Sequence, residues 1–217
     1  MYPFRPFLLC CISVMILLPS CKDLTGIPEN FDYGRIENNA YVNDYFEFRF
    51  PMENGWQPMD NSIMDSLREK TAEEMAAADP AMQKTMEVAD VRTANLLTAM
   101  YAPPDEFQLF NANINFIAEN VKIALNIRNG RDYLESAKKF MGNMEYSIDF
   151  KGDIYEQEIG GKTFYCMDVV NHYGGTDILQ SYYATIIKSF AFTFVTTYVT
   201  DDQKAAVQTA IDQIEFQ

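Results

Sequence analysis

The sequence contains one histidine and four cysteines, and both scarcities exclude classes of site. Cys10 and Cys11 lie within an apolar N-terminal run and Cys21 follows it, so Cys166 is the only cysteine in the body of the chain. Within residues 22–217 it has no partner for an intramolecular disulfide or for a cysteine-type metal site. The sequence also contains no glycine-rich phosphate loop, zinc spacing or serine nucleophile elbow. We therefore predict that the protein is not an enzyme and binds neither a cofactor nor a metal.

Basic residues are also few, with 17 Lys and Arg against 31 Asp and Glu and a net charge of −14. Arg5 is the only charged residue among the first twenty, so the remaining chain carries 16 basic and 31 acidic residues, a net charge of −15. Such a surface repels nucleic acid and anionic lipid headgroups. We predict no nucleic-acid partner and a domain that stands off any membrane to which it is attached.

The N-terminal residues have the organisation of a signal peptide. Arg5 precedes the apolar run from Phe7 to Leu18, which is about a dozen residues long and shorter than the roughly 20 that span a bilayer as a helix. Leu18-Pro19-Ser20-Cys21 follows directly. An apolar residue, two small or tolerated residues and then Cys resembles the cleavage box of bacterial lipoproteins, in which the cysteine thiol receives a diacylglyceryl group and the chain is cut before that cysteine.

This resemblance implies that residues 1–20 are a lipoprotein signal peptide and that Cys21, once lipidated, is the first residue of the mature chain. Two or more acyl chains are enough for stable membrane attachment. The expected location is the bacterial cell envelope, with the protein lipid-anchored and facing the periplasm or the cell exterior. The alternatives are an ordinary secretory peptide with a chance cysteine, or an uncleaved anchor helix.

Residues 21–40 are polar, with scattered Gly, Pro and Asn, and are predicted to be a flexible tether from the lipidated Cys21. Residues 41–217 have the length of a single domain. Alternation and helical spacing predict an α+β fold, with an antiparallel sheet covered by helices. Strands are expected over 41–42, 45–50, 93–102, 111–118, 146–150, 155–159, 163–170, 179–187 and 190–198, and helices over 60–78, 81–89, 129–144 and from 200 to near 214.

The pattern also predicts turns and buried faces. A hairpin tip is expected over residues 104–106, a hairpin turn at Gly160-Gly161, and Gly174-Gly175 falls between the next two strands. The strand over 190–198 is expected to bury Phe190, Phe192 and Phe194, with Ala191, Thr193 and Thr197 on its other face. The helix over 129–144 is expected to have an apolar stripe formed by Tyr133, Ala137, Phe140, Met141 and Met144.

The opening of this domain carries a further resemblance. Tyr45-Phe46-Glu47-Phe48-Arg49-Phe50-Pro51, followed by Gly55-Trp56, resembles the first hairpin of PsbP-like domains, and a helix near the C-terminus fits the same plan. The resemblance implies an α/β/α sandwich across residues 41–217. It implies no chemistry, because members of that group have no common catalytic residues. Trp56 is interpreted as a core anchor.

Several polar residues could form a site, although each has an ordinary structural explanation. Cys166, Asp168 and His172 suggest a cysteine–histidine pair, but the local charge is negative and His172 is expected beyond the strand's end, so Cys166 is interpreted as a core residue. Asn113 and Asn115 are expected on one face, towards solvent or a cleft. The acidic pairs are interpreted as exposed strand and helix-cap residues: Glu156 with Glu158, and Asp201 with Asp202.

The sequence therefore predicts a membrane-anchored envelope lipoprotein that acts as a non-catalytic binding or accessory module, with the membrane as one partner and an unidentified protein as a possible second. The alternative is a small-ligand-binding or hydrolytic envelope protein that uses a cleft near His172, Asn113 or Asn115. A pocket that converges on His172 or on paired acids would favour the alternative.

Overall fold

The computed structural model describes residues 26–60, 91–101, 110–142 and 148–217. Residues 61–90 contain nearly all of the two helices predicted over 60–78 and 81–89, which therefore lie outside the described residues. The hairpin tip expected near Pro104 also lies outside the described residues.

The described elements are β1 Arg35–Glu37, β2 Ala40–Asn43, β3 Phe48–Pro51, β4 Trp56–Pro58, β5 Thr93–Tyr101, β6 Asn113–Asn120, α4 Gly130–Met141, β7 Ile148–Ile159, β8 Lys162–Tyr173, β9 Thr176–Ile187, β10 Phe190–Tyr198, α5 Asp201–Ile211 and β11 Glu215–Phe216.

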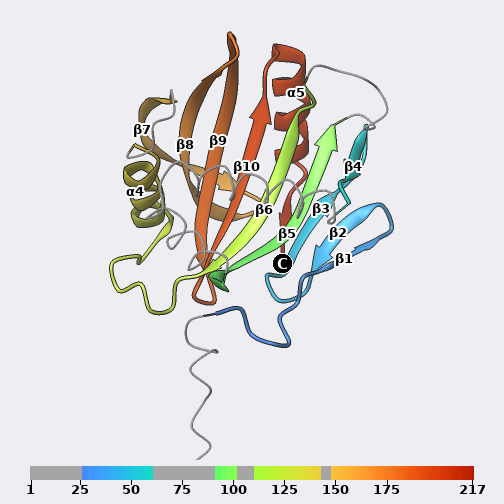
Figure 1. The fold of residues 1–217 in the computed structure, drawn as a ribbon. Helices are drawn as coiled ribbons and strands as arrows, with labels where there is room; N and C mark the ends of the chain where they lie inside the picture. The colour runs from blue at the N-terminus through green and yellow to red at the C-terminus, as the bar shows by residue number, and fades with distance from the viewer. Residues whose placement is uncertain (1–25, 61–90, 102–109, 143–147) are drawn as a thin grey trace, which may run out of the picture.

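The strands of the described segments form two antiparallel sheets (Figure 1). The larger sheet has seven strands in the order β4-β5-β6-β10-β9-β8-β7, and the smaller has four in the order β1-β2-β3-β11. The last four strands of the larger sheet are joined by tight turns at Gly160-Gly161, Gly174-Gly175 and Lys188-Ser189. Consecutive strands joined in this way build a sheet from local pairings, and the C-terminal half of the chain follows that plan.

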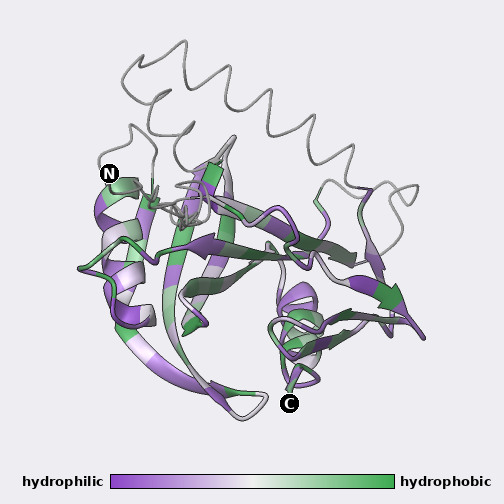
Figure 2. Cartoon of the chain, turned by 90° about the horizontal axis from the view of Figure 1, so that it is seen from below, coloured by the Kyte–Doolittle hydropathy of each residue, from purple (hydrophilic) through white to green (hydrophobic). Residues whose placement is uncertain are grey.

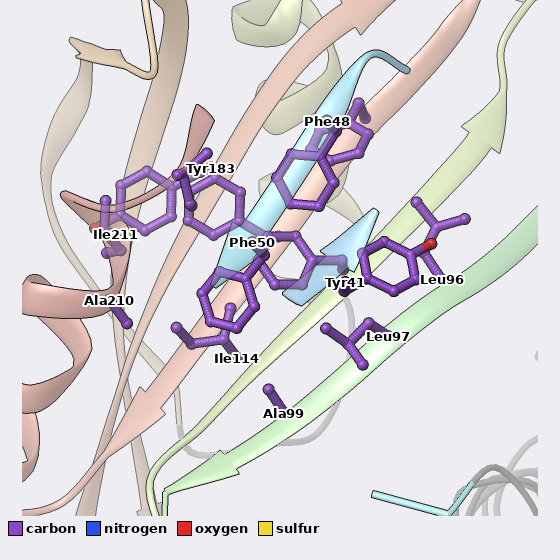
Figure 3. Close-up of a cluster of buried hydrophobic side chains, with 14 of the residues drawn as sticks. Tyr41, Phe48, Phe50, Leu96, Leu97, Ala99, Ile114, Tyr183, Ala210 and Ile211 are labelled. Atoms are coloured by element: carbon purple, nitrogen blue, oxygen red, sulfur yellow. The ribbon is translucent and has the colours of Figure 1, made fainter. Parts of the chain in front are cut away.

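One face of the larger sheet is rich in phenylalanine and holds the main core. Phe190, Phe192 and Phe194 of β10 point to this face, while Ala191 and Thr193 point to the other, as the alternation predicted. The smaller sheet and α5 cover the Phe face, and Figure 3 shows side chains from both sheets and from α5 within this cluster. Trp56 is 5% exposed and packs against Tyr101, which confirms its interpretation as a core anchor.

Helix α4 covers the opposite face of the larger sheet. Asn129 caps its start by accepting a hydrogen bond from the backbone N–H of Asp132. Leu134 is fully buried against side chains of β7, β8 and β9. The predicted apolar stripe omitted Leu134 and is wrong at Phe140, which is 37% exposed. Its members Tyr133 and Met141 do pack against this cluster, whereas Met144 lies outside the described residues. Gly130, Leu134 and the partly buried Met141 are four and seven residues apart, which places them on one helix face.

The predicted fold class, an α+β protein with an antiparallel sheet covered by helices, is confirmed, and the second sheet is an additional cover for the Phe face. Three short strands, β1, β4 and β11, were not predicted. The two strands expected over 146–150 and 155–159 are parts of the single bulged strand β7. The strand predicted over 45–50 begins only at Phe48, because residues 44–47 form a turn in which Glu47 has a positive φ of 54°.

The prediction that residues 21–40 form a flexible tether is wrong for residues 26–40. Ile27 and Phe31 pack against the main core, and β1 and the first residue of β2 lie in this range. The Asn120 side chain also donates a hydrogen bond of 2.7 Å to the backbone oxygen of Gly26. The sequence did not predict these contacts, because the few apolar residues that make them are widely spaced among polar turn residues.

Candidate functional site

A cavity of about 310 Å³ lies between α5 and the Phe face of the larger sheet. Along β8 this face changes from Phe164 and Cys166 to Asp168, and along β10 from Phe194 to Thr196, so the apolar core gives way to a polar floor. The apolar wall is Val207 and Ile211 of α5, with Lys204 and Gln208 beside them. The strand residues of the lining are Lys151, Tyr155, Gln157, Asp168, Val169, Val170, Leu179, Gln180, Ser181, Tyr183, Thr196 and Tyr198.

Asp168 is the acidic residue on this floor. Ser181 donates a hydrogen bond of 2.6 Å to its Oδ1, and the Tyr155 hydroxyl donates one of 3.3 Å to its Oδ2. An ionised carboxylate can accept about four hydrogen bonds, so each oxygen keeps acceptor capacity for a further donor. The floor of the cavity can therefore bind a ligand hydroxyl or amine.

A bulge in β7 brings Tyr155 to Asp168. Lys151 pairs with Asp168 and Tyr155 pairs with Cys166. Between these two pairs β7 advances by four residues while β8 advances by two. Gly152 has a φ of +70°, in the left-handed region that favours glycine, and it lies inside this bulge. The bulge shifts the outer strand of the sheet so that a tyrosine hydroxyl faces the carboxylate.

The tyrosines of the cavity remain neutral hydrogen-bonding groups. Burial raises the pKa of Tyr155, Tyr183 and Tyr198, and the nearby Asp168 carboxylate raises each of them further. Their hydroxyls therefore stay protonated through the physiological range. The Tyr183 ring is stacked on Phe194 with the ring centres 4.4 Å apart, which fixes the ring between cavity and core.

Cys166, Asp168 and His172 are not brought together as one site. Cys166 is fully buried, and burial followed by the Asp168 charge raises the pKa of its thiol to about 12, which confirms its interpretation as a core residue. The prediction that His172 lies beyond the end of the strand is wrong, because His172 belongs to β8. It still lies six residues along the strand from Cys166, a distance of about 20 Å.

His172 lies near the end of β8, between β7 and β9, and does not line the cavity. Its Nδ1 is 2.7 Å from Asp177 and its Nε2 is 3.3 Å from Asp149, and its side chain is 39% exposed. These two carboxylates raise the pKa of His172 through hydrogen bonds. This cavity is therefore not the cleft that the alternative prediction placed near His172, because its polar residues converge on Asp168.

The other predicted candidates also lie apart from the cavity. Asn113 and Asn115 share one face of β6, as predicted, but it is the face opposite Phe116 and the main core, and Asn115 accepts a hydrogen bond of 2.9 Å from Thr98. The acidic pairs are exposed on β7 and at the start of α5: Glu156 with Glu158, and Asp201 with Asp202. In the part of the chain that the structure describes, no group of three or more His, Cys, Asp or Glu side chains could hold a metal ion.

Sequence reasoning missed Tyr155, Ser181, Tyr198 and Lys204 as cavity residues. One signal was available, since Asp168 continues the buried face of Phe164 and Cys166, and an acidic residue on a buried strand face needs partners. The partners themselves come from β7 and β9 and depend on strand register. Cys21, the predicted lipidation site, lies outside the described residues.

Comparison with known proteins yields fold-level similarity alone. No protein-family model matches the chain, and no curated protein matches it. The crystal structure of LpqN, involved in cell envelope biogenesis of Mycobacterium tuberculosis, is similar with a TM-score of 0.46 and 12% identity over 77% of this chain and 82% of LpqN. A Pseudomonas aeruginosa protein of unknown function, a putative regulator, has a TM-score of 0.36 and 12% identity over 51% of this chain and 86% of its own. Similarity at this level assigns no activity.

No helix among the described residues is both long enough and apolar enough to cross a bilayer.

Proposed function

We propose that this protein is a lipid-anchored accessory protein of a bacterial cell envelope, whose PsbP-like domain binds a partner without catalysing a reaction on it. The observation that carries the proposal is the Leu18-Pro19-Ser20-Cys21 box at the end of an apolar run that is too short to span a bilayer. The domain begins close behind this box, since four residues separate Cys21 from Gly26, where the described fold starts.

Metabolic labelling tests the anchor. Bacteria that produce the protein are fed an alkyne-bearing fatty acid, and the purified protein is examined by click chemistry and by mass spectrometry of its N-terminal peptide. We expect label on the wild type and none on Cys21→Ser. Cys166→Ala is the matched control, because Cys166 is buried and should play no part in acylation. An unmodified, intact N-terminus on the wild type would refute the proposal.

A second candidate function, the binding of a small ligand, is favoured by the cavity under α5. Its volume of about 310 Å³ lies at the lower end of the range for ligand pockets, and it combines the Asp168 carboxylate with three tyrosine rings. A small molecule with hydroxyl or amine groups, such as a sugar or an amino compound, suits this lining. It would donate to Asp168 and place an apolar face against Val207 and Ile211.

Native mass spectrometry of the protein purified from its own membranes tests this candidate. We expect a bound small molecule on the wild type and its loss from Asp168→Asn, in which one acceptor oxygen is replaced by a donor. Glu156→Gln is the matched control, since Glu156 is an exposed carboxylate on β7 that does not line the cavity. Equal loss from both variants, or no bound molecule on the wild type, would argue against a ligand in this cavity.

A further inference from the structure

The loop between β6 and α4, residues 121–129, differs in charge from the rest of this acidic protein. Its sequence, VKIALNIRN, contains no acidic residue and two basic ones, Lys122 and Arg128. Arg131 follows in the first turn of α4. The whole chain has a net charge of −14, so this loop is a local exception.

The same loop exposes apolar side chains. Leu125 is 92% exposed and Ile123 is 42% exposed. The backbone is held in successive turns, with the N–H of Ala124 bonded to the oxygen of Val121 at 2.9 Å and the N–H of Ile127 bonded to that of Ala124 at 2.9 Å. A turned backbone of this kind presents Ile123 and Leu125 outward. Scattered exposed leucines are ordinary, but exposed apolar residues among cations are typical of segments that lie in a membrane interface.

The start of the described chain lies beside this loop. The Asn120 side chain, at the last residue before the loop, donates a hydrogen bond of 2.7 Å to Gly26. The N–H of Val121 bonds to Ser189 in the turn between β9 and β10 at 3.0 Å. The N–H of Ile27 bonds to Val91, a third exposed apolar residue, at 3.1 Å. The loop, this turn and the first described residues thus share the lower end of the molecule in Figure 1, the end that Figure 2 views from below.

Chain length keeps this end near the lipid. Cys21 and Gly26 are five residues apart, and an extended chain spans at most about 3.6 Å per residue, so Gly26 can lie no more than about 18 Å from the anchored cysteine. The surface of the bilayer must therefore pass close to the end of the molecule that carries Ile123, Leu125 and Lys122.

We propose that the 121–129 loop is a second membrane contact, with Leu125 and Ile123 in the lipid interface and Lys122 at the level of the phosphates. This inference depends on the proposed lipid anchor at Cys21. Two of the three cations also have partners within the protein: Arg128 forms an ion pair with Asp132 at 2.9 Å, and the Arg131 guanidinium lies 5.2 Å from the centre of the Tyr165 ring. The apolar side chains and Lys122 thus provide the contact, at one edge of a domain that is otherwise repelled by anionic lipid.

The contact also sets the orientation of the cavity. Ser181 lies six residues along β9 from Ile187, and Thr196 six residues along β10 from Phe190, so both are about 20 Å from the turn that adjoins Gly26. With the loop in the bilayer, the cavity under α5 faces away from the membrane and towards the aqueous phase.

Depth measurements with an environment-sensitive fluorophore test the contact. The full lipoprotein carrying Leu125→Cys is labelled with nitrobenzoxadiazole and reconstituted into vesicles of phosphatidylethanolamine and phosphatidylglycerol that contain nitroxide-labelled lipid. Thr176→Cys is the matched control, because Thr176 is exposed in the turn region at the opposite end of β9. Cys166 is buried and should not take the label.

We expect the label at 125 to lose most of its fluorescence to the lipid nitroxide and to shift to shorter wavelength, and the label at 176 to do neither. Before reconstitution, the mass of the N-terminal peptide establishes whether Cys21 carries lipid. A peptide without lipid overturns the anchor and this inference with it. A lipidated protein whose label at 125 behaves like that at 176 overturns this inference alone, and leaves the loop exposed to water or to a protein partner.

Discussion

Asn43 is the buried polar residue that fixes the N-terminal segment to the rest of the domain. It is completely buried at the end of β2. Its Nδ2 donates to the backbone oxygen of Asp32 at 2.9 Å, and its Oδ1 accepts from the N–H of Phe46 at 2.9 Å. One amide therefore satisfies two backbone groups, the buried N–H of Phe46 and the part-buried oxygen of Asp32.

Asn43→Ala is expected to lower the free energy of unfolding by about 2–4 kcal/mol, because it leaves both backbone partners without a hydrogen bond and each unsatisfied group costs about 1–3 kcal/mol. Urea denaturation followed by Trp56 fluorescence measures the change. Asn126→Ala, at an exposed position of the 121–129 loop, is the control and should stay within about 0.5 kcal/mol of wild type. A loss at Asn43 no larger than at Asn126 would mean that water or a shifted backbone replaces the amide.

Cys166 illustrates how burial removes the reactivity of a residue that resembled a nucleophile. Its side chain is fully buried and the pKa of its thiol is raised to about 12, so almost no thiolate is present at pH 8. We expect iodoacetamide to leave Cys166 unmodified in the native protein at pH 8 and to alkylate it fully in concentrated urea, as read by peptide mass. Rapid alkylation of the native protein would show that the core opens around β8.

At the scale of elements, His172 links the three outermost strands of the larger sheet. It belongs to β8 and contacts Asp149 of β7 and Asp177 of β9. Both carboxylates raise its pKa above the ordinary value, and its hydrogen bond in turn lowers the pKa of Asp149. A raised folded-state pKa means that the stabilisation is fully present below the unfolded pKa of about 6.5 and is lost as the pH rises through the folded pKa.

The sole histidine gives a direct measurement of this effect. We expect the proton resonances of His172 to titrate with a pKa above 6.5, the ordinary value for a histidine side chain. We also expect the loss of stability in His172→Gln to be larger at pH 5.5 than at pH 8.5 in urea denaturation, and Asp177→Asn to lower the His172 pKa towards that of a free imidazole. A pKa at or below the ordinary value would mean that solvent screens both ion pairs.

The long, regular strands of this protein were predictable from sequence, whereas its very short strands were not. The alternation in β10 gave the correct buried face, and the glycine pairs gave two of the turns. By contrast, β1, β4 and β11 are two or three residues long and carry no period of their own. They form because the partner strand supplies the hydrogen bonds, which a local pattern does not reveal.

The candidate cavity was harder to predict from the sequence than the fold was. Asp168 was identified, but as a neighbour of Cys166 and His172. Its actual partners, Ser181 and Tyr155, lie 13 residues away in the chain in opposite directions and meet it through strand pairing and the β7 bulge. A bulge shifts the register of every residue pair beyond it. A site that depends on a bulge therefore cannot be predicted from the spacing of its residues in the sequence.

At the scale of the whole molecule, two chemically different ends follow from one sheet. The turn at Lys188-Ser189 and the 121–129 loop lie at the end near Gly26, while Asp149, Asp177 and the Gly174-Gly175 turn lie at the other. The 121–129 loop contains no acidic residue, so we expect an acidic body to turn this loop towards an anionic bilayer, because repulsion acts on the remainder of the surface. In the proposed arrangement, the lipid on Cys21 would provide attachment and the 121–129 loop would provide orientation.

Attachment itself should therefore depend on the lipid. We expect the chain that begins at Lys22, produced without the signal peptide, to remain in the supernatant when vesicles of phosphatidylethanolamine and phosphatidylglycerol are sedimented at low salt. Burying Leu125 and Ile123 contributes at most about 3–6 kcal/mol, comparable to a single myristoyl chain, which alone binds membranes only marginally. The net charge of −15, from 16 basic and 31 acidic residues after residue 20, adds repulsion that salt would weaken. The lipidated protein is the positive control and should sediment with the vesicles. Sedimentation of the lipid-free chain at low salt would mean that the 121–129 loop outweighs the acidic surface.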